Sequence, residues 1–127
     1  NSPRDGTFQR MPTLRELTEA IQQRPGVKAV VILGADGLLI ETHDSAQNDA
    51  EALAARVPAV ATAVSQLGDA ASAGEASMVV LEFQRGYGVV LRLSDHVLLF
   101  VSASPDIALA DLLFDLRRHR SAMASLV

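Results

Sequence analysis

The stretch NDAEALAARVPAVATAVSQL, residues 48–67, decides how this chain folds. Its first four residues, Asn48 to Glu51, have the spacing of a capping box and predict the start of a helix. Gly68 predicts the end of that helix, because glycine favours the turn that follows a helix. Larger apolar side chains recur along it at alternating spacings of four and three residues, which is a heptad-like stripe. They are Leu53, Val57, Val60, Val64 and Leu67.

The other faces of this predicted helix are also nearly free of polar side chains. Alanines fill them, and the polar side chains between Ala52 and Val64 are those of Arg56 and Thr62. A helix that is apolar all round is expected to be buried all round, whereas one sheet covers a single side. The sequence therefore predicts a second covering surface, which alanines allow to come close. Pro58 predicts a kink or a restart, because proline removes a backbone hydrogen bond.

Five strands are predicted around this helix. Their ranges are 27–33, 38–42, 78–84, 87–93 and 97–103. The first strand is a continuous β-branched run, which suits burial on both faces, and the Asp36-Gly37 turn leads into the short return strand. Because the first and last strands are apolar on both sides, we expect them to lie side by side at the centre. The second strand turns polar after Ile40, which indicates a sheet edge.

A helix is predicted at each end of the chain. Thr13 and Glu16 have capping-box spacing, and Arg24-Pro25-Gly26 ends a helix over about 13–24. Ser104-Pro105-Asp106 combines a capping serine, a proline at the first helical position and an acid. We expect the last helix to start there and to run to about Ser125. The order α-β-β-α-β-β-β-α predicts an α+β fold, an antiparallel sheet with helices packed on it.

Composition limits the class of protein. With 127 residues, 49% of them apolar, the chain suits a single domain with a core of its own. We expect that domain to cover 12–127, preceded at 1–11 by a flexible arm or a tag remnant. The absence of cysteine argues against disulfides and thiolate metal sites, and favours the cytoplasm. The arginine-rich and alanine-rich composition favours a bacterial source.

Charge and hydropathy disfavour two kinds of partner. The formal net charge is −4, whereas a nucleic-acid binder usually has a basic balance. No apolar run approaches the ~18 residues that a membrane helix needs. We therefore expect neither a nucleic-acid partner nor membrane insertion.

The sequence offers no set of residues that predicts catalysis, a cofactor or a metal. His43, His96 and His119 lack ligand partners at helical or hairpin spacing, and we interpret each as a solvated surface residue. Ser94-Asp95-His96 contains the residue types of a hydrolase triad, but consecutive residues cannot take the triad geometry, so we predict a turn. The glycine-rich turns lack the spacing of a phosphate-binding loop. We therefore expect a protein that is not an enzyme.

Two charged features each allow two interpretations. The cluster 117–120, Arg-Arg-His-Arg, could bind an acidic or phosphate-bearing partner. We favour a structural role, in which its cations complement the helix dipole and pair with Asp115. Glu82 and Arg92 could face each other across a hairpin, which we favour, or belong to a polar recognition surface.

These segments together resemble the Roadblock (dynein light-chain-type) domain family. The resemblance rests on Pro25-Gly26-Val27, on Ala35-Asp36-Gly37-Leu38 and on Leu53-Ala54-Ala55, followed by the strand triplet and the capped last helix. It covers about 12–125 and is strongest to short, stand-alone bacterial regulators of Ras-like GTPases. It implies the sheet order 2-1-5-4-3, with the central helix on one face and the terminal helices on the other.

The resemblance also implies a function. Family members form homodimers by pairing central helices and third-strand edges, which fits the excess apolar surface noted above. The polarity and gliding members bind a small Ras-like GTPase and stimulate its hydrolysis without inserting an arginine finger, so we do not assign that role to Arg56. We expect a homodimeric signalling module without a cofactor. Its dimer or partner interface is expected at Leu53, Arg56, Val57, Val60, Ala63, Val64, Leu67, Met78, Val80 and Glu82.

Two alternatives stay open. The first is a scaffold subunit that has no effect on GTP turnover. The second is a profilin-like or PAS-like ligand-sensing domain, which would need polar groups converging in an apolar pocket. A large pocket between the sheet and the first helix would favour that second alternative.

Overall fold

The computed structural model describes residues 12–44 and 49–127, so the arm expected at 1–11 lies outside the described residues. The described residues form three helices and five strands in the predicted order. Their bounds are α1 Leu14–Gln22, β1 Val27–Gly34, β2 Leu39–Asp44, α2 Ala50–Ala70, β3 Met78–Phe83, β4 Gly86–Arg92, β5 Val97–Ala103 and α3 Leu109–Ala124. The α+β class is confirmed.

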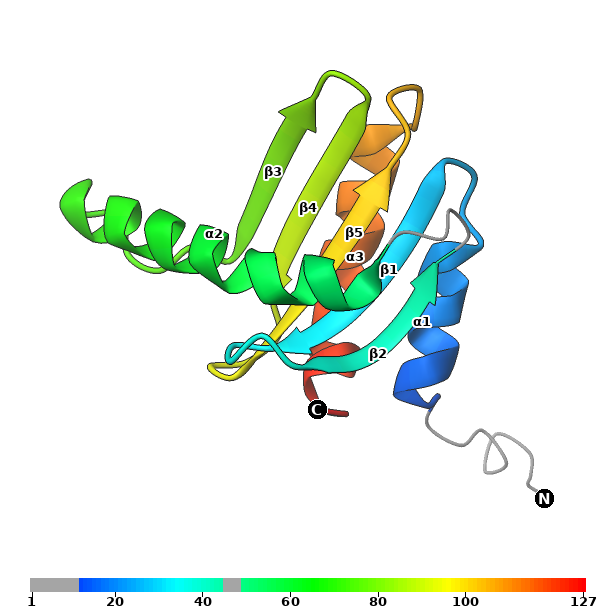
Figure 1. Cartoon of the computed structure of the whole chain (residues 1–127), viewed down its shortest axis with the longest axis horizontal. Helices are drawn as coiled ribbons and strands as arrows, with labels where there is room; N and C mark the ends of the chain where they lie inside the picture. The colour runs from blue at the N-terminus through cyan, green and yellow to red at the C-terminus, as the bar shows by residue number, and fades with distance from the viewer. Residues whose placement is uncertain (1–11, 45–48) are drawn as a thin grey trace.

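The strands form one antiparallel sheet in the order β2-β1-β5-β4-β3 (Figure 1). β1 and β5 lie at its centre because their side chains are apolar on both faces. Val30 to Leu33 and Leu98 to Val101 are buried throughout. β2 and β3 form the two edges. The central pair expected from the apolar runs and the order implied by the resemblance are both confirmed.

Apolar side chains on the two faces of the sheet form two separate cores. On one face the terminal helices contribute Ile21, Leu112, Leu116 and Met123. On the other face α2 contributes Ala54, Val57 and Ala61. Figure 1 shows α2 in front of the sheet, with α1 and α3 behind it. A fully buried Leu or Met stabilises the fold by roughly 1.5–3 kcal/mol relative to an exposed one. The face covered by α1 and α3, whose core has more buried residues, therefore holds more of the stability.

α2 is one unbroken helix that passes through Pro58. Of the two outcomes predicted for this proline, a kink or a restart, the restart does not occur, because a proline removes a single hydrogen bond from a helix that is long on either side of it. The carboxylate of Asp49 caps the helix by accepting from the amide of Ala52 at 3.1 Å. Asn48, the first residue of the predicted capping box, lies outside the described residues.

Gly68 lies inside α2, so the predicted helix end at this glycine is wrong. The loop after α2 folds back over it. The amide of Ala73 donates to the carbonyl of Gly68 at 2.8 Å, and a Cβ added at Gly68 would lie 2.2 Å from the carbonyl oxygen of Gly74. Glycine is therefore needed here for the close approach of two backbone segments rather than for stopping the helix.

α3 begins at Leu109, later than the sequence predicted. The hydroxyl of Ser104 donates to the carboxylate of Asp106 at 2.6 Å, and this bond lowers the pKa of Asp106. The amide of Ile107 donates to the carbonyl of Ser104 at 3.2 Å and closes a turn. Because the serine is used in that turn, it does not cap the helix, and the N-cap is Ala108 without a side-chain hydrogen bond.

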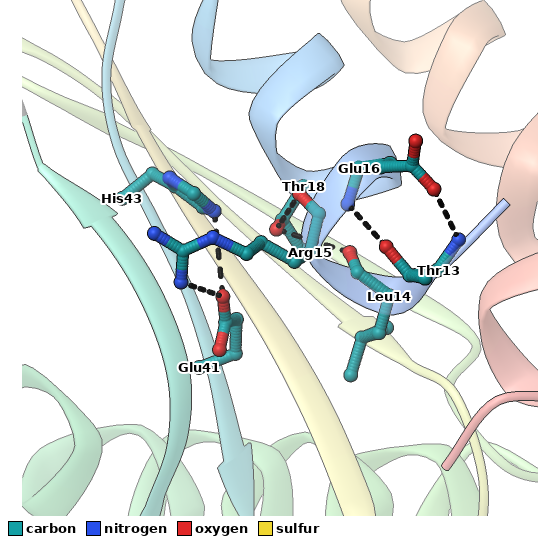
Figure 2. Close-up of polar contacts among 7 residues, drawn as sticks. All are labelled: Thr13, Leu14, Arg15, Glu16, Thr18, Glu41 and His43. Carbon is teal, nitrogen blue, oxygen red and sulfur yellow. Dashed lines mark hydrogen bonds and ion pairs between the residues drawn. The ribbon is translucent and has the colours of Figure 1, made fainter.

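α1 starts with the predicted capping box. The amide of Glu16 donates to the Thr13 hydroxyl at 3.1 Å, and the amide of Thr13 donates to the Glu16 carboxylate at 2.8 Å (Figure 2). The buried hydroxyl of Thr18 donates to the carbonyls of Leu14 and Arg15. A polar side chain on the sheet-facing side of α1 is thus satisfied within the helix.

His43 is not the solvated residue that the sequence predicted. Its side chain is 13% exposed, and its Nε2 lies 3.5 Å from the Glu41 carboxylate. The same carboxylate accepts from Arg15 at 3.3 Å (Figure 2). The prediction was wrong because His43 and Glu41 share the sheet face on which α1 packs, as their pairing with Val30 and Ile32 of β1 shows.

Asp115 of α3 bonds to the segment that follows α1. Its carboxylate accepts from Arg24, just after α1, and from Arg118 at 2.8 Å. The Nδ1 of His119 lies 2.9 Å from the carbonyl oxygen of Asp115. His119 is also half-buried, so the prediction of a solvated side chain is wrong. Its burial, and then the positive charges of Arg118 and Arg24, lower its pKa.

The contact at Gly68 gives a first test. Gly68→Ala should lower the free energy of unfolding by about 1–3 kcal/mol, because the new methyl group meets a backbone carbonyl that cannot move cheaply. Helix propensity alone predicts the opposite sign, a gain of about 1 kcal/mol. Urea unfolding measures the difference, with Gln66→Ala at an exposed position of the same helix as the control. A gain in stability for Gly68→Ala would contradict the packing described here.

The lowered pKa of His119 gives a test of pH dependence. A group whose pKa is lowered on folding contributes stability above its unfolded pKa of about 6.5, and this contribution is lost as the pH falls. His119→Gln should therefore flatten the fall in unfolding free energy on the acidic side of that value. His96→Gln, in an exposed turn, is the control and should keep the wild-type slope. Equal slopes for wild type and His119→Gln would count against the burial of this ring.

Candidate protein-binding surface

α2 contacts the sheet along only part of its length. Its buried side chains all come before Thr62, and from Thr62 to Ala70 each residue is exposed or half-buried. Leu67 is 67% exposed. Figure 1 shows the C-terminal part of α2 extending past the edge strand β3. This part of the helix presents apolar side chains that the sheet does not cover.

The sequence-predicted α2 residues therefore have different environments. Val57 is buried against the sheet. The half-buried ones are Leu53, Val60 and Val64. The exposed ones are Arg56, Ala63 and Leu67. The heptad-like stripe thus begins on the sheet and ends beyond it.

The sheet face under α2 is also incompletely covered. An open groove of about 290 Å³ lies between α2 and the β3–β4 hairpin. Its apolar lining includes Leu53, Phe83 and Phe100, and its polar lining includes Lys28, Arg85 and Ser102. Phe83 is 57% exposed. A Cβ added at Gly88 would lie 3.0 Å from the Phe100 ring and 3.2 Å from the Phe83 ring, so both rings lie over this glycine. The groove has an aromatic floor that is partly open to solvent.

β3 is the sheet edge beside this groove. Its residue Val79 pairs with Val90 of β4, whose side chain lies in the α2 core. By strand alternation, Val79, Leu81 and Phe83 share the α2 face. The opposite face holds the three β3 residues that the sequence analysis placed in the interface, Met78, Val80 and Glu82.

Sequence reasoning missed Phe83 as part of this surface. The alternation of β3 did separate Val79, Leu81 and Phe83 from their neighbours. It could not show which of the two sets lies on the α2 side, because that depends on how the whole sheet is oriented. The available signal was an aromatic residue close to the end of the predicted strand at 78–84.

The predicted pairing of Glu82 with Arg92 is wrong. Glu82 lies opposite Tyr87, and the amide of Arg92 bonds to the carbonyl of Ser77 at 3.1 Å, at the other end of the hairpin. Arg92 shares the α2 face through its partner Leu98. The tight turn between β3 and β4 sets this register, and it puts the two side chains on opposite faces. Glu82 is left as an exposed acid.

Two other sequence features take the predicted form. Ser94 and His96 lie in the β4–β5 turn, where the Ser94 hydroxyl accepts from the His96 amide at 3.2 Å. Asp36 and Gly37 lie in the β1–β2 turn, where the Asp36 carboxylate accepts from the Leu38 amide at 3.1 Å. Across 12–44 and 49–127, no three His, Asp or Glu side chains are grouped to hold a metal ion, and no helix is long and apolar enough to cross a membrane.

Comparison with known proteins places this arrangement in a family. The model of the Roadblock/LC7 domain matches residues 13–103. The Roadblock/LC7 domain from Streptomyces avermitilis is 21% identical, with a TM-score of 0.77, covering 91% of this chain and 95% of that one. MglB from Myxococcus xanthus is 16% identical, with a TM-score of 0.81, covering 89% and 93%.

A third similar structure is MglB in a tetrameric arrangement, 17% identical, with a TM-score of 0.80, covering 89% of this chain and 86% of that one. No curated protein sequence matches the chain. At these identities the structures show a shared fold, and the family model, which covers most of the chain, shows the family. The chain belongs to the Roadblock/LC7 domain family.

Proposed function

We propose that this protein is a homodimeric, non-enzymatic binding module that regulates or recruits a small Ras-like GTPase. One observation carries the proposal: the half of α2 that the sheet does not cover, with Val64 and Leu67, lies beside an open groove and the β3 sheet edge. Membership of the Roadblock/LC7 family supports it, because the resemblance implies pairing of central helices and of third-strand edges.

A second copy of the chain is the proposed occupant of this surface. A two-fold axis beside β3 continues the sheet into the second copy and brings each α2 over the groove of the other. Val64 and Leu67 of one copy then cover Leu53 and Phe83 of the other. Each large apolar side chain buried in this way contributes roughly 1.5–3 kcal/mol. The tetrameric arrangement of one MglB structure supports self-association as a property of such domains.

The GTPase partner rests on the family resemblance. Arg56 and Thr62 are exposed polar residues on α2, next to the apolar part, and they form the candidate contact for this partner. We do not assign Arg56 as an arginine finger. The proposed module acts by binding and orienting the GTPase, and the chemistry of hydrolysis belongs to the GTPase itself.

The ligand-sensing alternative needs space between α1 and the sheet. Thr18 and Ile21 are buried there, and Leu14 and Leu17 pack on the same core. No observation favours this alternative, and we do not propose it. A scaffold without effect on turnover uses the same surface as a regulator, so a turnover assay separates the two.

The dimer gives the next test. In light scattering, wild type should have the mass of a dimer and Leu67→Glu that of a monomer, because a carboxylate in the apolar contact is costly to bury. Leu38→Glu is a matched control, because Leu38 is 68% exposed but lies before β2, at the far edge of the sheet. It should stay dimeric. A monomeric wild type, or equal loss of dimer in both variants, would rule out this interface.

The GTPase contact has its own test, with a Ras-like GTPase encoded near the gene and single-turnover hydrolysis as the readout. Wild type should bind the GTP form and raise the hydrolysis rate, and Leu67→Glu should lose this effect. Arg56→Ala should change the stimulated rate by less than about tenfold, whereas removal of a true arginine finger costs roughly 10³-fold or more. Binding without a change in rate would identify a scaffold. No binding in either nucleotide state would refute the GTPase partner.

A further inference from the structure

α3 carries an exposed aromatic side chain beside two arginines on its outer face. Phe114 is 63% exposed, and the guanidinium carbon of Arg118 lies 5.6 Å from the centroid of its ring. Arg117, also exposed, follows Phe114 by three residues and Arg118 by four, so all three side chains lie on one side of the helix. Figure 1 places α3 on the face of the sheet opposite α2.

The part of α3 that follows Phe114 is rich in positive charge, although the chain as a whole is acidic. From Arg117 to Val127 the sequence has three arginines and no acid, against a net charge of −4 for the chain. Of the two acids near Phe114, Asp115 is already paired with both Arg24 and Arg118, and Asp111 is exposed one turn before the ring. After burial, the charges of Arg118 and Arg24 are the causes that lower the pKa of His119, which agrees with a positive potential here.

The helix dipole does not explain this cluster. The dipole effect is confined to the last turn of a helix, and the last turn of α3 contains no basic residue. Arg120 has a structural contact, since its Nε donates to the carbonyl of Arg92 at 2.9 Å. Among the described residues, Arg117 makes no such contact. The dipole part of the structural interpretation is therefore wrong, and pairing with Asp115 accounts for Arg118 alone.

We propose that Phe114, Arg117 and Arg118 form a second docking site, which binds an acidic protein segment that contains an aromatic or aliphatic side chain. Arginine binds carboxylates through two parallel hydrogen bonds, and the exposed ring gives an apolar side chain a surface to pack on. The stacking of Arg118 on Phe114 holds both groups in place before the segment arrives.

Charge complementarity favours a protein segment over other anionic partners. Nucleic acids and membranes are bound by extended arrays of cations, which neutralise many phosphates at once. This site has two exposed arginines around one ring, on a chain that is acidic overall. The site lies on the face opposite α2, so the proposed homodimer leaves it open and it does not depend on the GTPase proposal.

The test uses a short fluorescein-labelled peptide in which pairs of Asp and Glu alternate with Phe and Leu, and anisotropy as the readout on the full chain. Phe114→Ala and Arg117→Glu should each weaken binding by about tenfold or more, the loss expected for a central aromatic or arginine anchor. Arg85→Glu makes the same charge change in the exposed turn between β3 and β4 and should change binding by less than about twofold. Thermal melts should show all three variants folded, because each replaced side chain is exposed.

Four results would overturn the proposal. One is no binding of the peptide to wild type. Another is an equal loss with Arg85→Glu, which would mean attraction to overall charge. A third is tighter binding of phosphatidylserine vesicles or single-stranded DNA through the same three residues. The fourth is association of a second copy that Phe114→Ala abolishes. Leu67→Glu should bind the peptide like wild type. Peptide binding therefore tests the α3 site separately from the proposed homodimer.

Discussion

The structure depends on how α2 packs on the sheet. This helix has few polar side chains on any of its sides, and the sheet covers only one side of it. Ala54, Val57 and Ala61 place the first half of α2 in contact with the sheet, and their small size keeps the helix close. The second half passes the β3 edge with Leu67 exposed. A helix of this composition is not covered by its own sheet, so the apolar surface that remains is available for another protein.

The two faces of the sheet differ in how completely their cores are closed. Leu112, Leu116 and Met123 close the core under α3 completely, with no exposed area. α2 contributes smaller side chains to the core on its own face, and that core opens into the groove beside Phe83. Changes at the open face can therefore alter what the protein binds while the closed face preserves the fold. The outer face of α3, with Phe114, adds a surface that the proposed self-association through β3 would leave free.

The sequence predicted the parts of this fold that depend on side-chain pattern. The runs at 27–33 and 97–103 are apolar on both sides, and that alone places β1 and β5 at the centre. The sequence-based predictions were wrong where a residue typical of a helix end makes a different contact in the folded chain. Gly68 receives a loop carbonyl instead of ending α2, and Ser104 bonds to Asp106 instead of capping α3. The α2 residues of the candidate surface could be predicted from their residue types. Phe83 could not, because it belongs to the surface only through the orientation of the sheet relative to α2.

The most direct test of the central claim is an isotope-filtered nuclear Overhauser measurement on a mixed sample, in which one set of chains is isotope-labelled and the other is not. Magnetisation transfer between the Leu67 methyl groups of one copy and the Phe83 ring of another is the predicted result. It would show that the uncovered half of α2 fills the groove of a second copy. Transfer between copies at β2 or α3 only, or none at all, would contradict the account.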